Sequence, residues 1–145
     1  MYKRLLENTL YSYFFRAKVI LLTGARQTGK TTLVENLLED HKLEYVTRKF
    51  NCDNVSDREM LSGRDFEFLD ALIGDAKIIF IDEGHKIKSV GETLKLLVDH
   101  YKTKKQIIVT GSSSINLLTN TEEPLTGRKL VFTLHPLSMD EIYPS

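Results

Sequence analysis

The chain contains a single cysteine, Cys52, so no disulfide can form within it. A lone thiol suits a reducing compartment, and a half-buried apolar position is the simplest expectation for it. No charge excess of either sign is present, because 20 Lys and Arg residues balance 20 Asp and Glu residues. The composition therefore gives no overall charge that would favour nucleic acid or a membrane surface as a partner.

Long apolar runs are also missing, and none approaches the length of a membrane-spanning helix. The first segment, Met1 to Phe15, mixes charged and amide side chains into its apolar positions, which predicts no secretory signal. We therefore expect a cytoplasmic protein with no membrane partner. No repeat, low-complexity stretch or linker divides the chain. With 41% apolar side chains it can bury one core, which predicts one domain over residues 1–145, entered through an amphipathic helix within residues 1–17.

The most specific motif is a phosphate-binding loop of the pattern G-x-x-x-x-G-K-[ST]. It consists of Gly24, Ala25, Arg26, Gln27, Thr28, Gly29, Lys30 and Thr31. An apolar run at 19–22 precedes it and a helical pattern follows, as this loop requires. The glycines allow backbone N–H groups to point at a β-phosphate, Lys30 reaches the β- and γ-phosphates, and the Thr31 hydroxyl is a ligand for Mg²⁺. With the helix N-terminus as an added anion site, the loop and the adjoining Thr32 are predicted to bind a nucleoside triphosphate.

Helical and strand-like segments alternate along the rest of the chain, as in doubly wound α/β folds with a parallel sheet. Continuous apolar runs at 78–81 and 107–109 are typical of strands buried on both faces. Segments 45–51 and 130–134 predict two more strands, the first of them at a sheet edge. Helices are expected where apolar residues recur with a helical period, including the segments 66–73, ended by Gly74, and 90–101. The first helix is expected to bury Tyr2, Leu5, Leu6, Leu10, Tyr13 and Phe14. The helix after the phosphate-binding loop is expected to bury Leu33, Val34, Leu37 and Leu38.

Two carboxylates, Asp82 and Glu83, follow the apolar run at 78–81. Ligands of open α/β sheets bind at the carboxyl ends of the strands, so both residues are placed for chemistry. Asp82 is predicted to hold Mg²⁺, directly or through water, and Glu83 to orient a water for attack on the γ-phosphate. The alternative is an exposed acidic turn without a function.

A hydroxyl-rich turn follows the strand at 107–109, and Thr110 and Ser112 are its better candidates for contact with the γ-phosphate or the attacking water. Equally, Ser112 to Ser114 could simply cap a helix that begins at Ile115. Arg128 precedes the last strand and could stabilise the transferring phosphoryl group, in trans from a neighbouring subunit. A surface arginine without such a role is the alternative.

Five segments in a fixed order now resemble a known family: G-A-R-Q-T-G-K-T-T, I-I-F-I-D-E-x-x-K, I-I-V-T-G-S-S-S, L-T-G-R and H-P-L-S-M-D-E-I. From about Lys18 to Tyr143 the chain is similar to predicted AAA+ superfamily ATPases of bacteria and archaea, which carry an AAA_14-type ATPase domain followed by a DUF4143 domain. The resemblance implies a P-loop NTPase of the ASCE/AAA+ type, a three-layer α/β sandwich around a parallel sheet of order 5-1-4-3-2. It implies an ATP-binding domain that hydrolyses ATP with Mg²⁺ in the complete assembly.

The same resemblance assigns roles to individual residues. Lys30 and Thr31 form Walker A, Asp82 and Glu83 form Walker B, Ser112 or Thr110 is sensor 1, and Arg128 is the finger. Two features depart from the family. Gly84 and His85 stand where members usually carry an apolar residue and Gln, which leaves the role of His85 open. The chain also ends at Ser145, where the family continues, so no helical lid domain is expected, and a homo-oligomer would form through that missing C-terminal region.

Two other functions remain open from the residues alone. The segment Asp82 to His85 fits the D-E-x-H motif of helicases, and 110–112 loosely resembles their third motif, but a helicase needs a second motor domain. An ATP-binding switch without turnover is the other. A nucleotide kinase is less favoured, because only Arg58 and Arg64 lie between 50 and 74 to serve an arginine-rich lid.

One basic loop contains Lys102, Lys104 and Lys105. These cations could touch nucleic acid, but a short loop in a neutral chain is more simply a solvated one.

Overall fold

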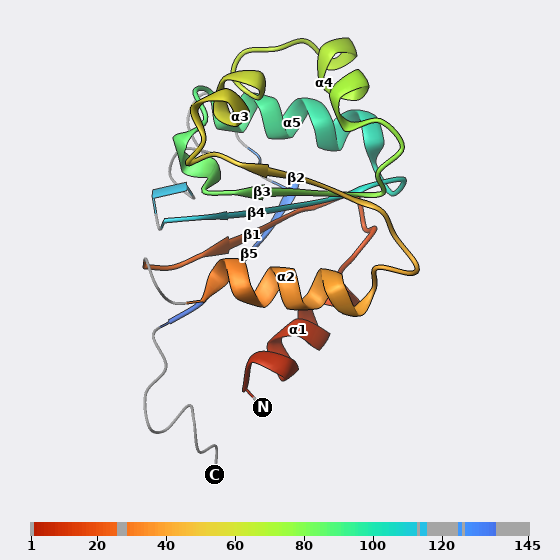
Figure 1. Cartoon of the computed structure of the whole chain (residues 1–145), viewed down its shortest axis with the longest axis vertical. Helices are drawn as coiled ribbons and strands as arrows, with labels where there is room; N and C mark the ends of the chain where they lie inside the picture. The colour runs from red at the N-terminus through yellow and green to blue at the C-terminus, as the bar shows by residue number, and fades with distance from the viewer. Residues whose placement is uncertain (1, 26–28, 113, 116–124, 126, 136–145) are drawn as a thin grey trace.

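Five parallel strands form one central sheet, and helices cover both of its faces (Figure 1). The structure is a computed structural model that describes residues 2–25, 29–112, 114–115, 125 and 127–135. In chain order the elements are α1 (Tyr2–Ser12), β1 (Val19–Thr23), α2 (Lys30–Asp40), β2 (Thr47–Asn51), α3 (Val55–Met60), α4 (Phe66–Ile73), β3 (Ile78–Asp82), the 3-10 helix η1 (Gly84–Lys86), α5 (Val90–Tyr101), β4 (Gln106–Gly111) and β5 (Lys129–Thr133).

The strands lie in the order β2-β3-β4-β1-β5, which confirms the predicted order 5-1-4-3-2 and the edge position of β2. The register pairs Thr23 of β1 with Gly111 of β4 and with Thr133 of β5. Asn51 of β2 pairs with Asp82 of β3 in the same way. The carboxyl ends of all five strands therefore share one edge of the sheet, and α2 begins at that edge (Figure 1).

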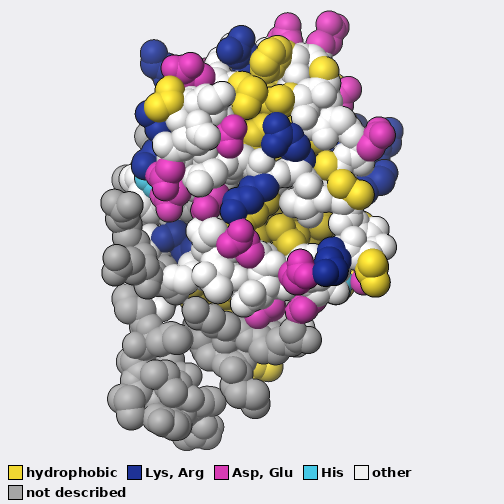
Figure 2. Space-filling view, in the orientation of Figure 1, with side chains coloured by type: hydrophobic (Ala, Val, Ile, Leu, Met, Phe, Trp, Pro, Cys, Tyr) yellow, Lys and Arg dark blue, Asp and Glu magenta, His cyan; other side chains and the backbone are white. Residues whose placement is uncertain are grey.

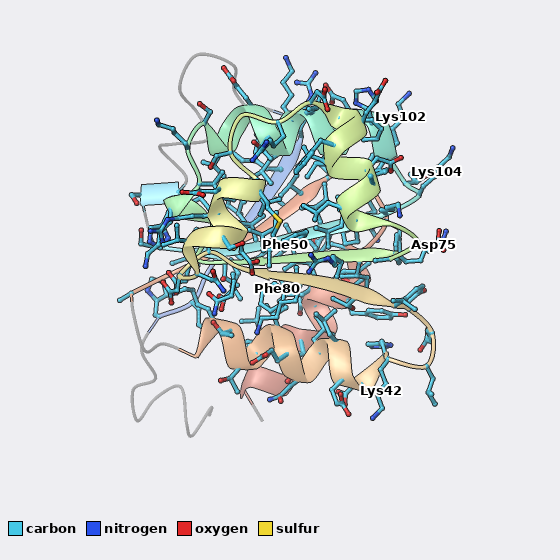
Figure 3. All side chains as sticks on the ribbon, turned by 45° about the horizontal axis from the view of Figure 1, so that its top comes forward. Lys42, Phe50, Asp75, Phe80, Lys102 and Lys104 are labelled. Carbon is cyan, nitrogen blue, oxygen red and sulfur yellow. The ribbon has the colours of Figure 1, made fainter. Side chains whose placement is uncertain are left out.

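Side chains that alternate along the strands fill two hydrophobic cores, one on each face of the sheet. One core packs strand residues against α1 and α2; its strand members are Ile20, Leu22, Ile78, Phe80 and Ile108. The other packs strand residues against α4 and α5; its strand members are Val19, Leu21, Phe50, Ile79, Ile81, Ile107 and Val109. Figure 3 labels one aromatic member of each core, Phe80 and Phe50. Burial on both faces explains why the central strands are uninterrupted apolar runs.

The N-terminal helix differs from the prediction. It ends at Ser12, and Tyr13 and Phe14 lie in the turn that follows it. Leu5, predicted on the buried face, is 63% exposed. The helix is anchored near its C-terminal end instead, where Leu10 and the following Phe14 are buried in the core beneath the sheet.

Helix α3 was not predicted, because none of its residues is buried and it therefore has no apolar period. It begins at a side-chain cap, since the Ser56 N–H donates to Asn54 Oδ1 over 2.9 Å. Cys52 just before it is buried, as expected, and burial raises the pKa of its thiol to about 12. This cysteine is consequently an unreactive thiol that packs in the core.

Charges of both signs are interspersed over the face in Figure 2. In the basic loop, Lys102 and Lys104 are exposed, and Figure 3 shows them with Asp75 at the end of the molecule where strands begin. Lys105 instead donates from Nζ to the backbone oxygens of Gly74 and Ala76, over 2.8 and 2.6 Å. None of the described helices is both long and apolar enough to span a membrane.

Candidate functional site

A cavity of about 130 Å³ opens at the carboxyl edge of the sheet. Its lining residues come from the phosphate loop, from the turn after β3 and from the end of β4: Gly24, Lys30, Glu83, His85, Lys86 and Ser112. A larger groove of about 480 Å³ lies between α2 and β2, but its ionic side chains already pair with one another, as Lys49 with Glu35 and Lys42 with Glu39. The smaller cavity is where three sequence motifs meet, so it is the candidate site.

Lys30 is the first residue of α2 and is 6% exposed. Its Nζ donates to the backbone oxygens of Gly24 and Ala25, over 3.0 and 2.9 Å. Gly29 precedes it with φ 88°, in the left-handed region that glycine adopts without strain, and this turn directs the chain into the helix. Arg26, Gln27 and Thr28 lie outside the described residues.

The two predicted magnesium ligands lie together. Thr31 Oγ1 donates to Asp82 Oδ1 over 2.8 Å, although the residues are far apart in sequence. Thr31 is half-buried and Asp82 is 6% exposed, while Thr32 faces solvent. A hydroxyl and a carboxylate oxygen suit Mg²⁺, which takes few protein ligands and fills its octahedron with water and phosphate oxygens. Among the described residues no cluster of three or more His, Cys, Asp or Glu could hold a metal by itself.

Thr110 lies beneath Asp82 at the end of β4 and is 0% exposed. Its hydroxyl donates to Asp82 Oδ1 and accepts the backbone N–H of Glu83 at 3.2 Å. The Thr110 hydroxyl therefore uses its proton in the hydrogen bond to the Asp82 carboxylate. Of the two candidates for contact with the γ-phosphate, only Ser112 lines the cavity, where its Oγ is 2.7 Å from Ser114 Oγ.

Glu83 adopts a left-handed backbone conformation, with φ 57° and ψ 42°, directly after β3. A non-glycine residue in that conformation is strained, and such strain is common where a side chain is held for function. The side chain lines the cavity and is 22% exposed. Its carboxylate thus has access to a water molecule or ligand in the cavity.

His85 and Lys86 also line the cavity, although the sequence motifs left the role of His85 open and assigned none to Lys86. His85 Nδ1 lies 3.2 Å from the Ser112 backbone nitrogen, which donates to it, and 3.6 Å from Glu83 Oε2. Burial lowers the pKa of His85, while Glu83 acts in the opposite direction. Lys86 forms an ion pair with Asp53 after β2. Two sequence signals included them, because His85 completes the D-E-x-H pattern and Lys86 ends the segment I-I-F-I-D-E-x-x-K.

Arg128 is remote from the cavity. It precedes β5 at the amino edge of the sheet, where its backbone oxygen accepts the Val19 N–H over 2.8 Å. Its Nε lies 2.7 Å from Asp99 Oδ1, and both side chains are partly exposed. A five-residue strand spans about 16 Å, so the whole sheet separates Arg128 from its own phosphate loop.

Comparison with known proteins agrees with the α/β fold described above. A family model described as an AAA domain, AAA_14, matches residues 16–143. Uncharacterized proteins of Mycobacterium bovis and Mycobacterium tuberculosis are each 33% identical over 127 residues, or 88% of this chain. The match covers 27% of each mycobacterial protein, so the chain spans about a quarter of the length of these relatives.

Solved structures agree at the level of the fold. A DNA replication initiation factor has a TM-score of 0.55 at 16% identity, covering 91% of this chain and 43% of the other. The Pif1 helicase of Candida albicans has a TM-score of 0.61 at 11% identity, covering 97% of this chain and 40% of the other. The phosphate loop, the parallel sheet and these neighbours together show a P-loop NTPase fold.

Proposed function

The chain belongs to the AAA_14 family of AAA domains, and from this premise we propose that it binds Mg-ATP at the carboxyl edge of its sheet and hydrolyses it in a complete assembly. One observation carries the proposal. Lys30 and Glu83 line one cavity, and their immediate neighbours in sequence, Thr31 and Asp82, are joined by a hydrogen bond, although the two segments lie far apart in the chain. A cation, a pair of hard oxygen ligands and a second carboxylate are the groups that phosphoryl transfer to water requires.

Binding of the triphosphate would use the phosphate loop and Lys30. The ammonium group now held by two backbone oxygens can turn to the β- and γ-phosphates, which offer a charged acceptor in their place. The N-terminus of α2 contributes its unpaired N–H groups to the same anion. Thr31 and Asp82 would hold Mg²⁺, which supplies neutralisation of the phosphate charge when it is bound.

Hydrolysis would use Glu83 and Ser112. The Glu83 carboxylate faces the cavity and can accept a proton from, and thereby orient, the attacking water. The Ser112 hydroxyl is available to contact the γ-phosphate, while Thr110 holds Asp82 from below. Thr110 therefore acts through Asp82, and Ser112 is the proposed sensor.

Arg128 is proposed to act in trans. Because it lies at the opposite edge of the sheet, only the cavity of a neighbouring subunit can receive its guanidinium group. Release from Asp99 costs little, since a partly exposed ion pair contributes about 0–1 kcal/mol. Assembly would then complete the catalytic centre, as arginine fingers do in other NTPases.

The test compares Lys30→Ala and Glu83→Gln by calorimetry with Mg-ATP and by release of phosphate. Lys30→Ala should weaken binding about tenfold to 100-fold, because it removes a charged hydrogen-bond donor worth about 1.5–3 kcal/mol. Lys42→Ala is the matched control, because Lys42 is exposed in the turn after α2 and its ammonium group pairs with Glu39. Glu83→Gln should bind Mg-ATP like the unmodified chain but release no phosphate.

Equal affinity of Lys30→Ala and Lys42→Ala would refute the binding site. If Mg-ATP binds tightly and Glu83→Gln releases phosphate as fast as the unmodified chain, the proposed role of Glu83 is refuted. Tight binding with no phosphate release under any condition of assembly would point to a switch without turnover.

A further inference from the structure

We propose that His85 is a positioning residue of the ATPase centre, holding the backbone of Ser112 in place and keeping the Glu83 carboxylate directed into the cavity. This inference rests on the function proposed above for the same site. It concerns a cavity-lining side chain that contacts both the turn after β3 and the turn after β4.

The contacts of His85 define its role. Its Nδ1 accepts the Ser112 N–H over 3.2 Å, so the backbone of the sensor turn is attached to the turn that carries Glu83. The two turns follow the neighbouring strands β3 and β4, whose last paired residues are Ile81 and Val109. Beyond that pair, the imidazole provides a side-chain link between them.

The hydrogen bond requires a neutral imidazole with the proton on Nε2, because Nδ1 must offer a lone pair. Partial burial of the ring favours this neutral form, and its lowered pKa agrees. Glu83 Oε2 lies 3.6 Å from the same Nδ1, a distance that would make an ion pair only if the ring were protonated. With a neutral ring, Nδ1 cannot donate to the carboxylate, so Glu83 keeps its lone pairs for groups in the cavity.

Two glycines leave room for this arrangement. A methyl group at Gly111 would lie 3.2 Å from His85 Nδ1 and 3.1 Å from Ile115 Cδ1, which would crowd the ring away from Ser112. A methyl group at Gly84 would lie 2.4 Å from Val109 Cγ1, so the absence of a side chain lets η1 lie flat on β4. The His85 ring and the turn that carries Ser112 can therefore pack closely because Gly84 and Gly111 have no side chains.

The consequence for catalysis is geometric. Glu83 must hold a water and Ser112 must reach the γ-phosphate, so their separation sets the alignment of attack. Loss of the link leaves the Thr110 hydrogen bonds to Asp82 and to the Glu83 backbone but releases the Ser112 backbone, and a misplacement of about 1 Å can cost about 100-fold in rate. Binding of Mg-ATP depends instead on Lys30, Thr31 and Asp82.

The experiment compares His85→Leu with His85→Asn in the 145-residue chain. Leucine fills similar space without an acceptor, whereas Asn Oδ1 occupies the position of Nδ1 and can accept the Ser112 N–H. Under single-turnover conditions with excess protein, His85→Leu should release phosphate about tenfold to 100-fold more slowly, and His85→Asn within about threefold of the unmodified chain. The affinity of all three for Mg-ATP should agree within about threefold.

A spectroscopic measurement tests the link without turnover. In ¹⁵N–¹H correlation spectra of the nucleotide-free chain at neutral pH, His85 should show the Nε2–H tautomer. The Ser112 amide should exchange with solvent faster in His85→Leu than in His85→Asn or the unmodified chain. A purely structural role would instead lower the melting temperature of both variants equally and leave their rates alike.

The failures are distinguishable. If the unmodified chain neither binds Mg-ATP nor responds to Glu83→Gln, the proposed function fails, while the tautomer and the Ser112 amide still report on the link. If the chain does hydrolyse ATP through Glu83 and His85→Leu matches it in rate, the inference about His85 is overturned. An Nδ1–H tautomer, or a Ser112 amide that is indifferent to both substitutions, overturns it as well.

Discussion

At the scale of single residues, Thr110 joins the two strands that carry the proposed catalytic groups. Its one hydroxyl donates to Asp82 and accepts from the Glu83 backbone, and no part of it is exposed. The sequence could name Thr110 and Ser112 as alternatives but could not choose between them, because both follow the same apolar run. In a continuing strand positions 110 and 112 would share one face, so the turn after β4 decides which hydroxyl faces the cavity.

Thr110→Val should therefore destabilise the nucleotide-free protein. The substitution keeps the shape of the side chain but leaves the buried Glu83 N–H without its acceptor and removes a donor from Asp82, at a cost of about 1–3 kcal/mol. Thr110→Ser keeps the hydroxyl and should lose less. Urea unfolding monitored by circular dichroism gives both free energies of unfolding. A Thr110→Val protein as stable as the unmodified chain, yet slow in hydrolysis, would indicate that Thr110 contacts the nucleotide instead.

At the scale of elements, η1 depends on a close approach to β4. Gly84 is buried, and a methyl group there would meet Val109 Cγ1 at 2.4 Å. Overpacking of this kind costs about 1–3 kcal/mol, because the neighbour belongs to a strand buried in the core. The short helix that presents His85 and Lys86 to the cavity is thus fixed by the residue at its start.

Gly84→Ala should lower the free energy of unfolding by about 1–3 kcal/mol in the unmodified chain and by less in a Val109→Ala background. Removing the valine methyl groups relieves the contact that the new methyl group makes. The coupling energy from thermal or urea unfolding of the four proteins in this cycle measures that contact. Equal costs in the two backgrounds would mean that Gly84 is required for another reason.

The elements that could be predicted from sequence are those with a strong apolar pattern. The strands at 78–82 and 106–111 contain the uninterrupted apolar runs 78–81 and 107–109 because both of their faces are buried, and α5 has a regular apolar stripe. Helix α3 has no buried side chain, and η1 is a single turn, so neither produces a period. In the site, Lys30, Thr31, Asp82 and Glu83 were predictable from motifs. The link through His85 was not, because it depends on two turns meeting in space.

At the scale of the whole molecule, the two edges of the sheet have different chemistry. The carboxyl edge holds the cavity. At the amino edge, four neighbouring strands are each preceded by a basic residue, namely Lys77, Lys105, Lys18 and Arg128. Three of these cations are occupied, since Lys18 and Lys105 bond backbone oxygens and Arg128 pairs with Asp99. Helices α2, α4 and α5 also end at this edge, where cations offset their dipoles, so the basic residues have a structural role.

The proposed trans role of Arg128 predicts that two inactive proteins restore activity when mixed. Arg128→Ala keeps its own cavity but lacks the finger, whereas Lys30→Ala has a defective cavity and an intact finger. A mixed interface then places a good cavity against a good finger, and phosphate release should exceed that of either protein alone. Normal hydrolysis by Arg128→Ala at every protein concentration would remove Arg128 from the mechanism.

The hydrogen bond between Thr31 and Asp82 has a consequence for the order in which ligands arrive. At 2.8 Å the two oxygens already lie about as far apart as neighbouring ligands of an octahedral Mg²⁺, but they would offer a lone cation only two protein ligands in exchange for its bound water. Phosphate oxygens add further ligands for the ion. Under the proposed function the ion and the triphosphate therefore each raise the affinity for the other by the same factor. The nucleotide-free protein would then bind little free magnesium at cellular concentrations and would bind the ion together with the nucleotide as one chelate.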